Sequence, residues 1–129
     1  LKQMGEISDH QVSDAISLAA RQLSYTLEAA AIVTYTATGG TARRVAHKRP
    51  SCMIVGMTDQ IKTARQLTAV WGVYPVLMQG IHTFEEMRVA AFDVVKRYGG
   101  DKGDTFVFTC GIPFGNPGST NIINVQVVS

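Results

Sequence analysis

The sequence is short of charge, of cysteine and of long apolar runs, and each shortage excludes a class of protein. Charged residues make up only 17% of the 129, and a net charge of +2 without a basic run indicates no nucleic-acid partner. Cys52 and Cys110 are far apart, which favours two reduced, buried thiols over a disulfide framework or a zinc site. No apolar run reaches the ~20 residues of a membrane-spanning helix. We therefore expect a cytoplasmic protein without a membrane partner.

Metal-binding clusters and the common nucleotide-binding motifs are lacking as well. His10, His47 and His82 are scattered, and the acidic pair Glu85-Glu86 is best explained as the charged first turn of a helix. Neither a Walker loop nor a G-x-G-x-x-G motif occurs. The sequence therefore predicts no metal site and no cofactor in this chain.

What the chain has instead is enough apolar residues, 46%, to bury the core of one domain. We expect residues 1–6 to be the remnant of a linker and residues 7–129 to form a single domain. Apolar runs predict five strands, at residues 31–35, 52–57, 73–78, 105–110 and 122–128. Helical patterns precede or separate the first four strands, at about residues 8–28, 42–47, 60–69 and 83–98.

This alternation predicts an α/β fold. Buried strands separated by helices require right-handed crossovers, and hence a largely parallel sheet covered on both faces. Pro75 lacks a donor and favours an edge position for the third strand, while alternating polar residues in the last run favour an edge or an interface. We expect Trp71 to pack at a helix end. The apolar spacing in the first helix predicts a buried face made of Val12, Ile16, Ala19, Leu23 and Leu27.

The function is interpreted from the turn between the first strand and the second helix, Thr36–Thr41, with the sequence TATGGT. Its two glycines let a ligand approach the backbone, and its three threonine hydroxyls lie beside the open N–H groups of a helix start. The positive end of the helix dipole adds to these donors, so the turn suits a phosphate group. On spacing alone, an ordinary strand-to-helix turn is an equally good interpretation.

A second segment strengthens the phosphate interpretation. The loop Gly111–Asn121 contains three glycines and two prolines, which predicts a rigid segment without regular structure. Ligands of parallel sheets bind outside the carboxyl ends of the strands. Because the turn and the loop both follow strand carboxyl ends, they can meet at one pocket.

These residues together resemble the C-terminal, regulatory domain of pyruvate kinase, in a bacterial style and over nearly the whole chain. Each motif is weak alone, but the series stands in the right order and at the right spacing. The motifs are AARQL (19–23), AIV (31–33), TGGTA (38–42), RP (49–50), KTARQL (62–67), WGVYPV (71–76), KGD (102–104), GIP (111–113) and GSTN (118–121).

The resemblance implies a three-layer α/β/α sandwich with a mixed five-stranded sheet whose last strand is antiparallel. It implies an allosteric site for a sugar phosphate, such as fructose 1,6-bisphosphate, or in some members for a nucleotide such as AMP. The phosphate positions would be Thr36, Ala37, Thr38, Gly39, Gly40 and Thr41. The positions of the loop that closes over the effector would be Gly111, Pro113, Gly115, Gly118, Ser119 and Thr120.

The resemblance also implies partners. In the family, the first helix and the last strand of this domain take part in the subunit contacts of a tetramer, so we expect a homo-oligomer. The catalytic barrel, with its Mg²⁺ and K⁺ sites, has no counterpart in these 129 residues. We expect the chain alone to be catalytically inactive and to act with the barrel of a parent enzyme.

One departure from the family pattern concerns charge. Many members have a basic residue inside or just after the phosphate turn, where this sequence has Gly40 and Thr41. The nearest cations are Arg43 and Arg44, and the sequence does not say whether they face the turn. Two alternatives therefore stay open: an assembly module with a vestigial effector site, and a free-standing phosphosugar-binding domain.

Overall fold

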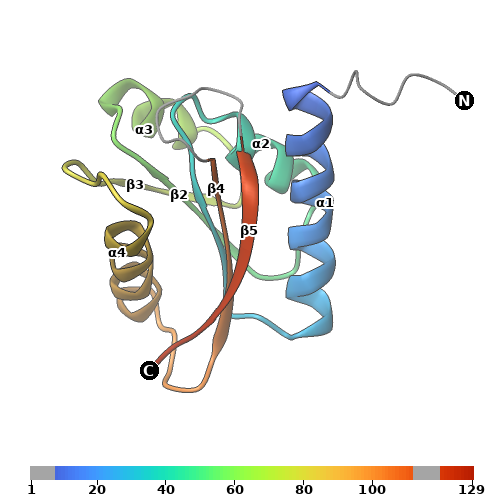
Figure 1. The fold of residues 1–129 in the computed structure, drawn as a ribbon, viewed down its shortest axis with the longest axis vertical. Helices are drawn as coiled ribbons and strands as arrows, with labels where there is room; N and C mark the ends of the chain where they lie inside the picture. The colour runs from blue at the N-terminus through green and yellow to red at the C-terminus, as the bar shows by residue number, and fades with distance from the viewer. Residues whose placement is uncertain (1–7, 112–119) are drawn as a thin grey trace, which may run out of the picture.

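Helices and strands alternate along the chain as the sequence predicts (Figure 1). The computed structural model describes residues 8–111 and 120–129. The helices are α1 (Asp9–Thr26), α2 (Gly40–His47), α3 (Ile61–Leu67) and α4 (Phe84–Arg97). The strands are β1 (Ala31–Tyr35), β2 (Met53–Thr58), β3 (Val73–Leu77), β4 (Thr105–Gly111) and β5 (Thr120–Val127).

The five strands form one mixed sheet in the order β3-β2-β1-β4-β5. The first four are parallel, and β5 alone runs antiparallel, against β4. Both predicted edge positions are confirmed, since β3 with Pro75 and β5 close the two ends of the sheet. The second strand begins one residue later than predicted, at Met53, and includes Thr58.

Helices cover both faces of the sheet, which makes the predicted three layers. Figure 1 shows α1 and α4 on opposite sides of the strands. The α4 face buries a cluster that includes Phe106, Phe108, Met57, Met87 and Val94. The other face packs against α1, α2 and α3, and its cluster includes Ala20, Ile32, Ala42, Val45 and Leu67.

The capping boxes that start α1 and α4 explain where these helices begin. The hydroxyls of Ser8 and Thr83 accept from the backbone N–H three residues on, and Gln11 and Glu86 accept from the cap N–H groups in return. The start of α3 lacks such a box. Gln60 occupies the N-cap of α3 and makes no side-chain capping bond.

The buried face of α1 also differs from the prediction. The predicted residues Val12, Ile16, Ala19 and Leu23 are only half-buried, and Leu27 is exposed. The stripe that meets the sheet is instead made of small residues, Ser13, Ser17, Ala20 and Ser24. The hydroxyls of Ser17 and Ser24 donate to the carbonyls of Ser13 and Arg21, so they are buried without an unpaired group. Small residues let the helix approach the sheet closely. A prediction based on the spacing of large apolar residues therefore misses the stripe.

Trp71 is the clearest correction. It was expected to pack at a helix end, yet 88% of its surface is exposed. The backbone turns at Gly72, with φ of +86°, before β3 begins at Val73. Cys110 is fully buried as expected, whereas Cys52 is half-buried.

Candidate anion-binding turn

The predicted turn lies where the order of strands reverses. β1 pairs in parallel with β2 on one side and with β4 on the other. Tyr35 and Gly111 are therefore the carboxyl-terminal ends of two neighbouring strands and lie at the same end of the sheet. Ligands bind at such a point in open α/β sheets. Of the predicted loop positions, Gly111 ends β4 and pairs with Thr120, which begins β5. Pro113, Gly115, Gly118 and Ser119 lie outside the described residues.

Hydrogen bonds occupy three successive carbonyl groups of the turn, those of Ala37, Thr38 and Gly39. The Ala37 carbonyl accepts from the Thr63 hydroxyl at 2.8 Å, and the Thr38 carbonyl accepts from Arg43 Nη1 at 3.1 Å. The Gly39 carbonyl accepts the first intrahelical bond of α2, from the Arg43 N–H, at 3.0 Å. The negative ends of these peptide dipoles are therefore bound within the protein.

The backbone N–H groups of the turn, unlike these carbonyls, are only partly bonded. Those of Thr36 and Gly39 are bonded, to the Met57 carbonyl and to the Thr36 hydroxyl, and these two bonds fix the shape of the turn. Those of Ala37, Thr38 and Gly40 make no hydrogen bond to another residue in the described ranges. A turn with bonded carbonyls and open N–H groups suits an anion.

Glycine is required at position 39. Its φ is +90°, and a Cβ there would lie 2.5 Å from Arg43 Nη1. The three threonines have different surroundings: Thr36 and Thr41 are buried, whereas Thr38 is exposed. Thr38 is therefore the hydroxyl that a ligand in solvent can reach first.

Both arginines of α2 fold back over the turn. Arg43 donates to the Thr38 carbonyl, and Arg44 Nη2 lies 2.5 Å from His10 Nδ1 in the first turn of α1. A Cβ at Gly40 would lie 3.3 Å from Arg44 Nη1, so this guanidinium fills the space beside Gly40. The first turn of α2 carries no acidic residue. The turn is therefore strongly cationic although its own sequence has no basic residue.

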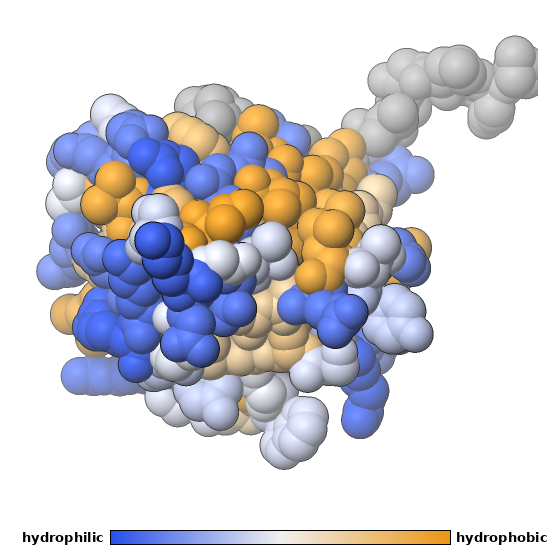
Figure 2. All heavy atoms as spheres, turned by 90° about the horizontal axis from the view of Figure 1, so that it is seen from below, coloured by the Kyte–Doolittle hydropathy of each residue, from blue (hydrophilic) through white to orange (hydrophobic). Residues whose placement is uncertain are grey.

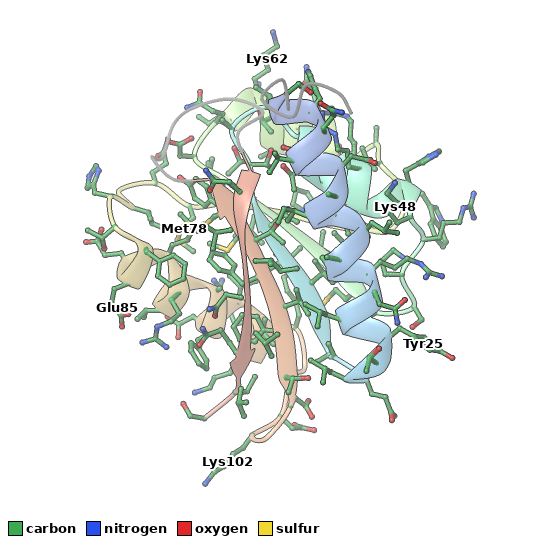
Figure 3. The ribbon with its side chains drawn as sticks, turned by 45° about the vertical axis from the view of Figure 1, so that its right-hand side comes forward. Tyr25, Lys48, Lys62, Met78, Glu85 and Lys102 are labelled. Carbon is green, nitrogen blue, oxygen red and sulfur yellow. The ribbon has the colours of Figure 1, made fainter. Side chains whose placement is uncertain are left out.

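The spacing of the two arginines in the sequence is the one local indication of this arrangement. Side chains three and four positions along a helix share a face, and they lean toward the helix N-terminus. Arg43 and Arg44 stand three and four residues after Gly40, so both can reach the turn. The supporting Thr63 and His10 come from α3 and α1, and no local pattern relates them to the turn. Figure 3 shows Lys62 of α3 at this end of the molecule with its side chain extended away from the body.

The opposite end of the parallel strands, away from the turn, is hollowed. A cavity of about 490 Å³ is lined by residues around the starts of β2 and β3, including Arg49, Cys52, Trp71 and Tyr74. Within residues 8–111 and 120–129, no three His, Cys, Asp or Glu side chains gather as metal ligands. None of the helices in these ranges has both the length and the apolar character to cross a bilayer.

Comparison with known proteins identifies relatives for almost all of this fold. The family described as "Pyruvate kinase, alpha/beta domain" matches residues 14–126. A pyruvate kinase from Geobacillus stearothermophilus is 38% identical over 130 aligned residues, covering 100% of this chain and 22% of the relative. Pyruvate kinase 2 from a Synechocystis species is 40% identical over 124 residues, covering 95% of this chain and 21% of the relative.

A solved structure agrees with these matches. The crystal structure of a pyruvate kinase from Cryptosporidium parvum superimposes with a TM-score of 0.83 at 25% identity, covering 97% of this chain and 24% of that one. The chain therefore spans about a quarter or less of the length of the relatives it matches.

Proposed function

This chain belongs to the pyruvate kinase family, as its C-terminal α/β domain, and we propose that its Thr36–Thr41 turn binds a phosphorylated effector. The observation that carries the proposal is the polarity of the turn. The carbonyls of Ala37, Thr38 and Gly39 are bonded within the protein, three N–H groups are open, and two guanidinium groups lie beside them. Effectors of the proposed class are sugar phosphates, such as fructose 1,6-bisphosphate, and nucleotides such as AMP.

Magnitudes support a regulatory site for an abundant metabolite. Hydrogen bonds to a charged group contribute about 1.5–3 kcal/mol each, and the helix end adds about 0.3–1 kcal/mol. Three or four such donors, less the cost of association, correspond to roughly millimolar to micromolar affinity. The parent enzyme's transfer of a phosphoryl group from phosphoenolpyruvate to ADP would need a barrel with Mg²⁺ and K⁺, which we propose as the domain's partner.

Titration calorimetry of the 129-residue chain tests the effector site. We expect binding of at least one among fructose 1,6-bisphosphate, ribose 5-phosphate and AMP, and its loss in Thr38→Asp. Thr38 is exposed, so the variant should fold while placing a carboxylate at the anion position. Thr26→Asp adds the same charge at the far end of α1 and should bind normally. Failure of all three ligands to bind the natural chain would exclude this function.

A second candidate, a subunit contact, rests on β5 and α1. β5 is an edge strand whose Val125 and Val127 are 40% and 54% exposed, and Leu18 on α1 is 53% exposed. Figure 2 shows a band of hydrophobic residues across the face seen from below, over β5 and neighbouring α1. An unpaired strand edge beside an apolar band favours association with a second copy of the chain.

Sedimentation at high and low concentration tests the contact. We expect the natural chain to associate as concentration rises and Val127→Lys to sediment as a monomer, because the lysine would be buried against apolar residues. Val89→Lys is the matched control, since Val89 is 47% exposed on α4, away from β5. A natural chain that stays monomeric at high concentration would count against the contact.

A further inference from the structure

We infer that Arg44 is the charged phosphate ligand of the turn and that His10 is the residue that positions it. The inference rests on the proposed effector function and adds two residues outside the Thr36–Thr41 turn. It starts from one atom, Arg44 Nη1, which is shielded from solvent and has no hydrogen-bond partner among the described residues.

An unpaired, shielded guanidinium nitrogen is costly, and its place indicates what would satisfy it. Leaving a buried donor without an acceptor costs about 1–3 kcal/mol, and more for a charged group. Nη1 lies beside Gly40, whose N–H is one of the open donors of the turn. A phosphate oxygen in the turn could accept from both, which would pair the orphaned nitrogen and the open N–H at once.

The other nitrogen of the same guanidinium explains how Arg44 is held there. Arginine has only donors, so His10 Nδ1 must accept from Nη2, which places the imidazole proton on Nε2. His10 belongs to the first turn of α1, which the capping box of Ser8 fixes. Of the two neighbouring arginines, Arg43 is already committed to the Thr38 carbonyl, so its role is to shape the turn.

Glycine at position 40 belongs to the same arrangement. A larger side chain there would compete with Arg44 for space, since even a Cβ would lie 3.3 Å from Nη1. The cation that the turn itself lacks is therefore supplied from one helical turn further along. Because His10 lies on α1, an oxygen bound to Arg44 is also linked to the N-terminal turn of that helix.

The test compares affinities for fructose 1,6-bisphosphate, with inorganic phosphate and AMP as further probes. Losing one charge-assisted bond should weaken binding of the best probe by about 10- to 100-fold in Arg44→Met. His10→Ala, which frees the guanidinium without removing it, should weaken binding by about 3- to 10-fold. His10→Gln offers Nη2 a side-chain oxygen acceptor in place of the ring nitrogen and should restore most of the affinity, which a merely structural role of the ring would not predict.

Controls separate this inference from the proposed function. Arg97→Met removes the same charge from the last turn of α4, on the other face of the sheet, and should leave affinity within about two-fold because exposed, distant charges are screened. A natural chain that binds no probe would exclude the effector function, and this inference with it. A natural chain that binds while Arg44→Met or His10→Ala binds equally well would overturn this inference alone. Melting curves of each variant verify that it is folded.

Discussion

The two faces of the sheet are built from different sizes of residue. On the α4 face, large side chains interlock, and the rings of Phe108 and Phe84 pack at a tilt with centroids 5.9 Å apart. On the opposite face, α1 and α2 meet the strands through small residues, including Ser17, Ala20 and Ala42. The first face buries more apolar volume for each residue, while the second lets helices approach the backbone closely.

The two faces differ in what they contribute: the α4 face contributes mainly to stability, and the small-residue face positions the candidate site. The helix side chains that we name at the proposed anion site all come from the small-residue face: α2 carries the arginines, α3 supplies Thr63, and α1 supplies His10. Close packing on this face fixes these helices relative to one another. We therefore expect damage to the α4 face to cost stability, and damage to the small-residue face to cost binding as well.

The largest expected effect is on the α4 face. Phe108 is fully buried in the sheet centre, so Phe108→Ala should lower the free energy of unfolding by about 3–5 kcal/mol through lost burial and a residual cavity. Urea denaturation measures the loss, and Phe108→Leu should cost less because it leaves a smaller cavity. Effector affinity should stay unchanged in any variant that remains folded. A loss under about 1 kcal/mol would contradict the importance of this packing.

Gly56 on β2 provides the matching change on the small-residue face. A Cβ there would lie 2.9 Å from Leu67 Cδ1 and 3.4 Å from Ala42 Cβ, between α3 and α2. Gly56→Ala should therefore cost about 1–3 kcal/mol by overpacking, partly offset by the lower flexibility of alanine in the unfolded chain. Because the methyl group pushes on both helices that hold the turn, calorimetry should also show weaker effector binding.

A second substitution sharpens that result. Leu67→Val shortens the side chain that the new methyl group would meet, so the double variant should be more stable than the sum of the two single effects predicts. If Gly56→Ala lowered stability without any change in affinity, the two faces would not differ in the way proposed here.

The fold was predictable because its pattern is local. Five apolar runs and the helical spacing between them established the strands, their parallel order and the edge position of Pro75, and the family resemblance supplied the antiparallel last strand. The misjudged face of α1 has a physical reason. Its buried Ser17 and Ser24 donate to carbonyls of their own helix, so these two hydroxyls are paired in the interior, and serines add nothing to the hydrophobic pattern of the sequence.

The candidate site was predictable only in part. The turn was located from its glycines and its place after a strand, but its hydrogen-bond polarity depends on Thr63 and Arg43, and Arg44 depends on His10. Thr63 lies 26 positions from its partner Ala37, and His10 lies 34 positions from Arg44. Packing of three helices on one face brings them together, and a single sequence does not encode such meetings in any local pattern.

The smallest expected effect concerns the two cysteines, one on each face of the sheet, whose reactivity with iodoacetamide reports how readily each face opens. Cys110 lies in the cluster under α4, where burial raises the pKa of its thiol to about 12; burial also raises the pKa of Cys52 on the other face, opposed by a hydrogen bond with Ser24. At pH 8, a thiol with a pKa of about 12 is about 10⁻⁴ ionised, so iodoacetamide should modify Cys52 first and Cys110 only after unfolding in urea. A Cys52→Ser variant isolates the rate of Cys110 modification.

The same thiol makes stability depend on pH. Since the folded state holds the Cys110 proton more tightly than the unfolded chain does, the free energy of unfolding should fall as pH rises above the ordinary thiol pKa of about 8.5. Rapid modification of Cys110 in the folded chain would show that the large-residue face opens more readily than its packing implies.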